Sequence, residues 1–335
     1  MLFIQKRYSV FSMPPLHQLK KSSCIIVLFL IGIFLFTCCT SSTRSAQQED
    51  VSGEQLEGNR PSFTPIAGTD FFEVRRSFDN GLAFDTLGFE QEPIWHLNFI
   101  SNDSVKIFSP DSNAMLHYSI YYDQDSIFHF GREWFRVKSL AKDSLLLQRL
   151  TVVAKHVKEA RSNVYMKLYS ARFIRDSLKT TVEELRKPRA NDTAFIRWRS
   201  DIANAHPTVI DSAFAARNPV ELIPKNNNIE VKRRTFSEAE RLEQSAAYVY
   251  LYPEYDIIIK HAYKNFYYPF SVLVDGSGNM HLGKFVTSEE FVASRKKVLN
   301  GIIDVYLKNW LTIRPGTTLG IPHTSLIMLR VRGVE

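Results

Sequence analysis

The fold of the C-terminal part of this chain depends most on one stretch, FSVLVDGSGNMHLGKF at residues 270–285. Its first segment, FSVLV (270–274), alternates apolar residues in the way that is typical of a strand with one buried face. The next five residues, DGSGN (275–279), contain two glycines among turn-forming side chains, and the strand pattern returns in MHLGKF (280–285). The sequence therefore predicts a β-hairpin.

The segments on either side of this hairpin complete a small α/β module over residues 236–335. Ser237 to Glu240 fits a capping box for a first helix, and Pro253 suits the first position of a second. A third helix is expected between Thr287 and Trp310, followed by a strand over 325–331. The expected fold is α+β, with a three-stranded antiparallel sheet in this module.

This arrangement resembles the C-terminal domain of TonB, a periplasmic energy-transducing protein. The matching features are Tyr252-Pro253, the run Phe270, Val272, Val274, Asp275 and Gly276, the helix ending at Trp310, and the turns at Pro315-Gly316 and Gly320-Ile321-Pro322. The resemblance implies that the sheet receives a short segment of a partner protein by strand addition. TonB couples through a histidine in its transmembrane helix, and residues 24–39 contain none, so energy transduction is not expected.

The last strand supplies the candidate partner-binding site. We expect residues 325–331 to pair with the hairpin along one edge and to leave the other edge open. The candidate binding residues are Tyr252, Pro253, Ser325, Ile327, Leu329 and Val331. Alternation places the last three of these on one face, against the helix that ends at Trp310. In the alternative interpretation, a linker segment or a second copy already covers the open edge.

The region 70–175 contains short aromatic and β-branched runs separated by turns, several of which begin with Asp followed by Ser or Thr. The aliphatic residue after each such turn, as in Asp85-Thr86-Leu87, is expected to begin a strand. The runs are at 95–100, 105–108, 116–122, 127–130, 134–140 and 144–150, with a closing strand within 163–174. This pattern predicts an antiparallel meander curled into a barrel or half-barrel, and it loosely resembles lipocalin-like domains of bacterial lipoproteins. Its interior would hold either a small apolar ligand or its own side chains, Trp95, Phe99, Trp134 and Phe135.

The two remaining segments of the folded part are expected to be connectors. Residues 40–69 are polar and lack periodicity, which favours a flexible tether. Residues 176–235 contain two short charged helices, each stopped by a proline, and then an extended pair around the Asn-rich turn at 226–228.

The N-terminus predicts export and membrane attachment. Two lysines precede the uncharged stretch from Cys24 to Cys39, which is short for a transmembrane helix. Leu35-Phe36-Thr37-Cys38 resembles the lipobox of bacterial lipoproteins, so residues 1–39 act as a signal peptide with Cys38, or alternatively Cys39, lipidated. The other alternative is an uncleaved membrane helix. Either anchor places the chain in a bacterial cell envelope facing the periplasm, with the outer membrane favoured.

Composition and motifs argue against several classes of function. The net charge is +7, but four positive charges lie in the first 37 residues, so no nucleic-acid partner is expected. Nucleotide-binding, zinc-protease and nucleophile motifs are absent, and His96, His117 and His129 lack ligand spacing. We therefore expect no enzyme, metal or cofactor. The sequence favours an adaptor that binds an envelope protein or an outer-membrane receptor segment, with a carrier of a small apolar ligand as the alternative.

Overall fold

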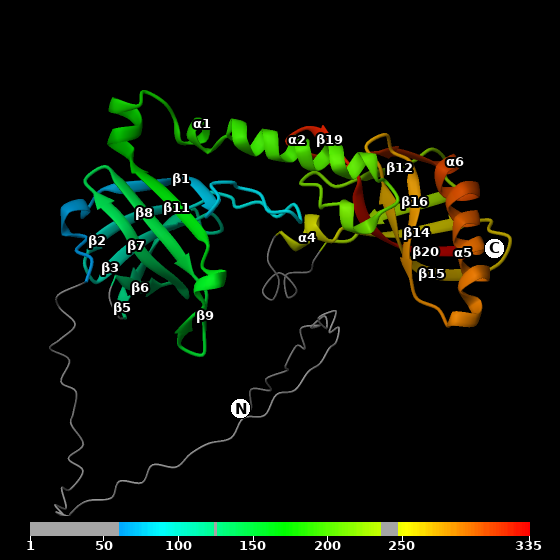
Figure 1. Ribbon diagram of the computed structural model, residues 1–335, viewed down its shortest axis with the longest axis horizontal. Helices are drawn as coiled ribbons and strands as arrows, with labels where there is room; N and C mark the ends of the chain where they lie inside the picture. The colour runs from blue at the N-terminus through cyan, green and yellow to red at the C-terminus, as the bar shows by residue number, and fades with distance from the viewer. Residues whose placement is uncertain (1–59, 124–125, 236–246) are drawn as a thin grey trace, which may run out of the picture. The chain divides into compact units, whose positions relative to one another are not determined.

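The computed structural model describes residues 60–123, 126–235 and 247–335, and these described residues belong to one compact unit (Figure 1). The predictions for the anchor at 1–39, including Cys38 and Cys39, and for the capping box at Ser237 lie outside the described residues. The predicted tether ends earlier than expected. Phe63 and Ile66 are fully buried, and the latter closes a short 3₁₀ turn, Thr64–Ile66.

The N-terminal sheet is an antiparallel meander in which most strands pair with their neighbours along the chain and the first strand also pairs with the last (Figure 1). Its strands are β1 (Asp70–Phe78), β2 (His96–Ser101), β3 (Ser104–Ser109), β4 (Ala114–Ser119), β5 (Tyr121–Tyr122), β6 (Ile127–Phe130), β7 (Glu133–Ala141), β8 (Ser144–Leu150) and β11 (Val164–Ser170). A two-residue ladder of β9 (Val152–Val153) and β10 (His156–Val157) projects between the last two. The predicted meander and its closing strand are confirmed, although β1 has no counterpart in the predicted runs.

One strand closes this sheet into a nearly complete barrel. The sheet order begins at β4 and ends at β5, yet these two are separated only by Ile120. Strand β4 pairs with β3, and β5 pairs with β6. Between them, the Ile120 amide donates to the Asp103 carbonyl at 2.8 Å. Because β4 and β5 are halves of a single strand, the ring has the eight strands at which side chains can fill the interior.

Aromatic side chains fill the barrel interior. Phe63 stacks on Phe99 with 4.2 Å between ring centroids, and Phe128 lies 5.6 Å from Phe135. All four rings are fully buried, and Trp95 packs against Phe135 at 5.3 Å. Of the four residues predicted to fill the interior, Trp134 is the exception, because it lies against His129 at 4.2 Å and outside the core cluster.

A buried ion pair joins the barrel to the connector that follows it. The connector contains α1 (Val182–Arg186) and α2 (Ala190–Ala205). At the start of α2 the fully buried Asp192 accepts hydrogen bonds from Arg75 of β1 at 2.6 and 2.9 Å, and from the Ala83 amide at 2.8 Å. Burial raises the pKa of Asp192, but these bonds and that from the Arg189 amide outweigh burial and leave the pKa below its usual range.

The C-terminal sheet has five strands in the order β13-β14-β20-β15-β16, antiparallel except for the parallel pair β14–β20. The strands are β13 (Ile229–Arg233), β14 (Glu254–Lys260), β15 (Phe266–Val274), β16 (Met280–Phe285) and β20 (Ser325–Val334). One continuous helical segment, α5 (Val292–Gly301), a π-helical turn (Ile302–Leu307) and α6 (Lys308–Trp310), packs on one face. Smaller elements are α4 (Tyr248–Leu251), β12 (Glu221–Pro224), β17 (Leu311–Arg314), β18 (Thr317–Thr318) and β19 (Ile321–Pro322).

The alternation predicted for the last strand is confirmed. Ile327, Leu329 and Val331 are at most 1% exposed and share a core cluster with Leu299 and Ile303 of the helix. The predicted hairpin of β15 and β16 and the helix ending at Trp310 are also present.

Three predictions for this module are wrong. The segment after Pro253 is the strand β14 and not a helix, because Tyr255, Ile257 and Ile259 alternate as buried residues. The sheet has five strands, not three, and residues 328–334 of β20 pair with β14, so the edge expected to be open is mostly covered from within the chain. In the connector, the two extended segments predicted around the Asn-rich turn are present as β12 and β13, but they pair with β17 and β14 and not with each other.

Candidate functional site at an uncovered stretch of the last strand

Strand β20 extends beyond the strand that covers it. Strand β14 begins opposite Met328, whose amide donates to the Pro253 carbonyl at 2.9 Å. At the far end, the Val334 carbonyl accepts from the Ala262 amide at 2.9 Å. Even-numbered residues of β20 therefore turn their backbone groups toward β14, and odd-numbered residues bond β15. Pro269 of β15 fits this alternation. It lies opposite Arg330, whose backbone groups face β14, so no amide of β15 is needed at that position.

Leu326 has the same orientation as Met328, but no strand lies beside it. Its amide and carbonyl face the side of β14 two residues before that strand begins. Within the described residues, no hydrogen bond to either group is present. A strand position whose amide and carbonyl have no strand beside them can pair with an extended segment, so this position is suited to receive a partner from outside the chain.

The uncovered stretch opens on a cavity of about 500 Å³ with a largely apolar lining. Five stretches of the sequence, several of them far apart, supply its walls. The lining residues are Asp85, Leu87, Phe89, Ile210, Ala213, Phe214, Ala215, Tyr248, Leu251, Tyr252, Pro253, Glu254, Ser271, Leu326, Ile327 and Met328. At the rim, the side chains of Leu87 and Tyr252 are 65% and 57% exposed, which leaves apolar surface available for contact.

The loop between β1 and β2 is held in place as one wall of this cavity. The Ala215 amide donates to the Leu87 carbonyl at 2.9 Å. Gly88 has φ +90°, and a Cβ there would lie 2.4 Å from the Ala215 carbonyl oxygen, so glycine is required for this approach. One carboxylate oxygen of Asp85 accepts from the amides of Leu87 and Phe89 at 2.9 and 2.8 Å. These bonds set the loop's shape before any partner arrives.

The charged groups of the cavity are acidic. Glu254 is neutralised by Arg330, with a second ion pair to Arg234 at 3.3 Å. Among the described residues, the carboxylate of Asp85 is bonded only to amides of its own loop. The hydroxyl of Ser271 is already committed to the backbone of Lys284, accepting at 2.7 Å and donating at 3.2 Å. The cavity therefore offers apolar contact, one strand-edge backbone position and one unneutralised carboxylate, a combination suited to binding.

The predicted site residues divide into two groups. Tyr252, Pro253 and Ile327 line the cavity, and Ser325 lies next to it, 2% exposed, with a hydroxyl that has no hydrogen-bond partner among the described residues. Leu329 and Val331 do not belong to the site, because both are fully buried in the core under the helix.

Several lining residues were not predicted. Leu326, the loop at 85–89 and the segment 210–215 come together only through tertiary packing. The only local sequence signal was in the loop, where Asp85 precedes Gly88 by three residues, a composition typical of a tight turn. The same motif was expected to begin a strand at Leu87, and that expectation is wrong, since Leu87 lies in the exposed loop.

The described part of the chain contains no cluster of three or more His, Cys, Asp or Glu side chains arranged to hold a metal ion. Among those same residues, no helix has the length and apolar character needed to cross a membrane. A scan against protein-family models and a search of curated proteins found no match to this chain.

Proposed function

We propose that this protein is a membrane-anchored adaptor of the cell envelope that binds an extended, apolar segment of a partner protein at the uncovered stretch of β20. The observation that supports this most is Leu326, whose amide and carbonyl face an apolar cavity without a partner in the described chain. An extended segment would satisfy both groups by pairing with them as a strand does. Alternate side chains of that segment would then enter the cavity.

The TonB resemblance supports recognition by strand addition as well. However, because part of β20 is already covered, the expected contact lies at the start of this strand. Strand β14 occupies the edge of residues 328–334, so only the first residues of β20 remain for pairing. The partner contact is accordingly short. Most of its free energy would come from the apolar side chain in the cavity, because one backbone pair contributes only about 1–2 kcal/mol in net terms.

Photo-crosslinking in intact cells tests this function. A benzophenone amino acid in place of Tyr252, at the rim, should give a discrete adduct with an envelope protein. Leu326→Pro should remove that adduct, because proline lacks the amide donor, whereas Leu326→Ala keeps the amide and should retain at least part of it. The same crosslinker in place of Val286, which is 97% exposed and outside the cavity, is the control. An adduct that persists unchanged in Leu326→Pro would contradict the proposal.

The anchoring part of the proposal rests on the lipobox-like sequence and has its own test. Replacing Cys38 and Cys39 together with Ala should release the protein from the membrane fraction. Retention after a carbonate wash would indicate an uncleaved membrane helix instead. The carrier alternative gains no support from the barrel, since Phe63, Phe99 and Phe128 occupy its interior.

A further inference from the structure

The outer edge of β13 is another place where the C-terminal sheet has no neighbour among the described residues. Strand β13 ends the sheet, and no described segment pairs with its outer side. The Lys260 amide donates to the Asn228 carbonyl at 2.8 Å and the Arg234 amide to the Glu254 carbonyl at 2.9 Å, so even-numbered residues of this stretch face β14. The backbone groups of Ile229, Val231 and Arg233 consequently point away from the sheet.

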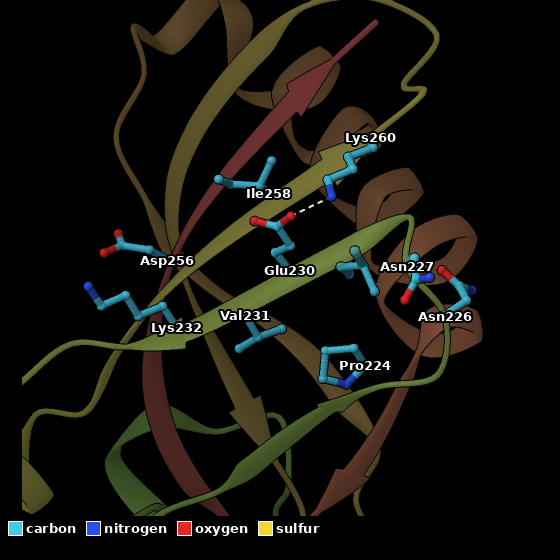
Figure 2. Close-up of a pocket in the computed structure, with 10 residues that line it drawn as sticks. Pro224, Asn226, Asn227, Glu230, Val231, Lys232, Asp256, Ile258 and Lys260 are labelled. Carbon is cyan, nitrogen blue, oxygen red and sulfur yellow. Dashed lines mark ion pairs between the residues drawn. The ribbon is translucent and has the colours of Figure 1, made fainter.

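A groove of about 620 Å³ lies beside this edge. It runs from β13 toward Pro224 at the end of β12, and Figure 2 shows Asn226 and Asn227 at the turn that joins the two strands. Pro224 has no amide to offer a neighbouring strand. Charged side chains of β13 and β14 lie along the groove, where Glu230 forms an ion pair with Lys260 (Figure 2). Lys232 forms no ion pair within the described residues.

The sequence of β13 is complementary to itself in an antiparallel pairing centred on Val231. That register places Glu230 of each copy opposite Lys232 of the other, on the same face of the sheet. It also pairs Val231 with itself and Ile229 with Arg233, and these three residues are the ones whose backbone groups point outward. A parallel in-register pairing would instead place Glu230 beside Glu230 and Lys232 beside Lys232, which is unfavourable.

We propose that the edge of β13 pairs with the same edge of a second copy of this chain. The pairing forms a two-fold symmetric dimer in which two five-stranded sheets become continuous. Each copy contributes the same residues, so two Glu230–Lys232 pairs form across the interface. This interface goes beyond the proposed partner binding, because it uses the edge of β13 and not the uncovered stretch of β20.

Charge exchange at this edge tests the dimer. Native mass spectrometry of the detergent-solubilised full-length chain should show a dimer for the unmodified protein. Lys232→Glu places Glu opposite Glu twice, and Glu230→Lys places Lys opposite Lys twice, so each variant alone should dimerise at least about tenfold more weakly. An equimolar mixture of the two variants should recover a heterodimer. In that mixed pair one copy presents only carboxylates at the two exchanged positions and the other presents only ammonium groups, so both cross-strand pairs are again oppositely charged.

Lys284→Glu is the matched control, since Lys284 is an exposed lysine on β16 at the opposite end of the sheet. It should dimerise like the unmodified protein. A monomeric unmodified protein would overturn the proposal and would show that the charges on β13 serve only to discourage pairing. Equal dimerisation of all variants, or a mixture no more dimeric than either variant alone, would overturn it as well by placing the interface elsewhere.

Discussion

The two large sheets of this protein differ in their edges: the barrel sheet closes on itself, whereas the C-terminal sheet is open. In the barrel, the single strand from 114 to 122 pairs with β3 through one half and with β6 through the other, so both ends of the sheet meet. In the C-terminal sheet, β20 extends beyond β14, and β13 has no outer neighbour among the described residues. Closure pairs the backbone groups of the barrel within its own sheet, so the side chains of the barrel serve its stability. An open sheet instead leaves backbone groups with which another chain can pair, and both of our binding proposals use such groups.

The largest expected effect tests the closed sheet. Phe99→Ala should lower the free energy of unfolding by about 3–5 kcal/mol, because the ring is fully buried and stacked on Phe63. Phe291→Ala is the control, since that ring is 53% exposed, and it should cost far less. Chemical denaturation of both variants gives the comparison. Similar losses would mean that the barrel interior is not a tightly packed core.

An intermediate effect is expected from pH, and it arises beside the open sheet. His323 precedes β20, is fully buried and stacks on Phe214 with 3.6 Å between centroids. Burial lowers its pKa to about 4. Since the unfolded chain, with a pKa of about 6.5, binds this proton more readily, stability is fully present above pH 6.5 and falls as the pH drops toward 4. The loss approaches about 3 kcal/mol.

Amide exchange followed strand by strand would locate this pH effect. Protection of β20 should decrease between pH 6.5 and 4 in the unmodified protein, and His323→Gln should flatten that dependence. A variant that keeps the same pH dependence would assign it to another group. The barrel's His129 also has a pKa lowered by burial, but its ring is partly exposed, so we expect a smaller change in that sheet.

The smallest effect on stability is expected at the rim of the cavity. Leu87→Ser should change the free energy of unfolding by no more than about 0.5 kcal/mol, because the side chain is 65% exposed. It should nonetheless weaken the crosslink formed from position 252. Leu178→Ser, which alters an exposed leucine outside the cavity, should leave both properties unchanged. A crosslink unaffected by Leu87→Ser would remove the loop from the binding surface.

The sequence predicted the barrel well and the C-terminal sheet only in part, for a physical reason. Except for the pair of β1 with β11, barrel strands pair with their neighbours along the chain, so alternation and turn residues determine most of the pairing locally. Strand β14 was predicted as a helix from Pro253, although the β-branched run Ile257 to Ile259 favours a strand. Its parallel pairing with β20 joins residues about 74 positions apart, and no local pattern encodes that contact.

The candidate site follows the same rule. Tyr252, Pro253 and Ile327 were predicted from the module that contains them, and all three line the cavity. Leu326 could not be identified from the sequence, because its backbone is unpaired only where β20 extends past the start of β14. That overhang depends on where both strands begin. The loop at 85–89 belongs to the barrel's chain segment, and only tertiary structure brings it to the C-terminal sheet.

The central position of β20 also affects the order of events during synthesis. Strands β14 and β15 both pair with β20, yet about 50 residues separate the end of β15 from its beginning. Until those residues have left the ribosome, β14 and β15 have no strand between them, and their apolar faces remain exposed to solvent. The barrel, whose last strand ends at Ser170, can close much sooner. A nascent chain of this protein therefore carries a finished barrel beside an unfinished sheet, and that interval is when chaperone contact matters most.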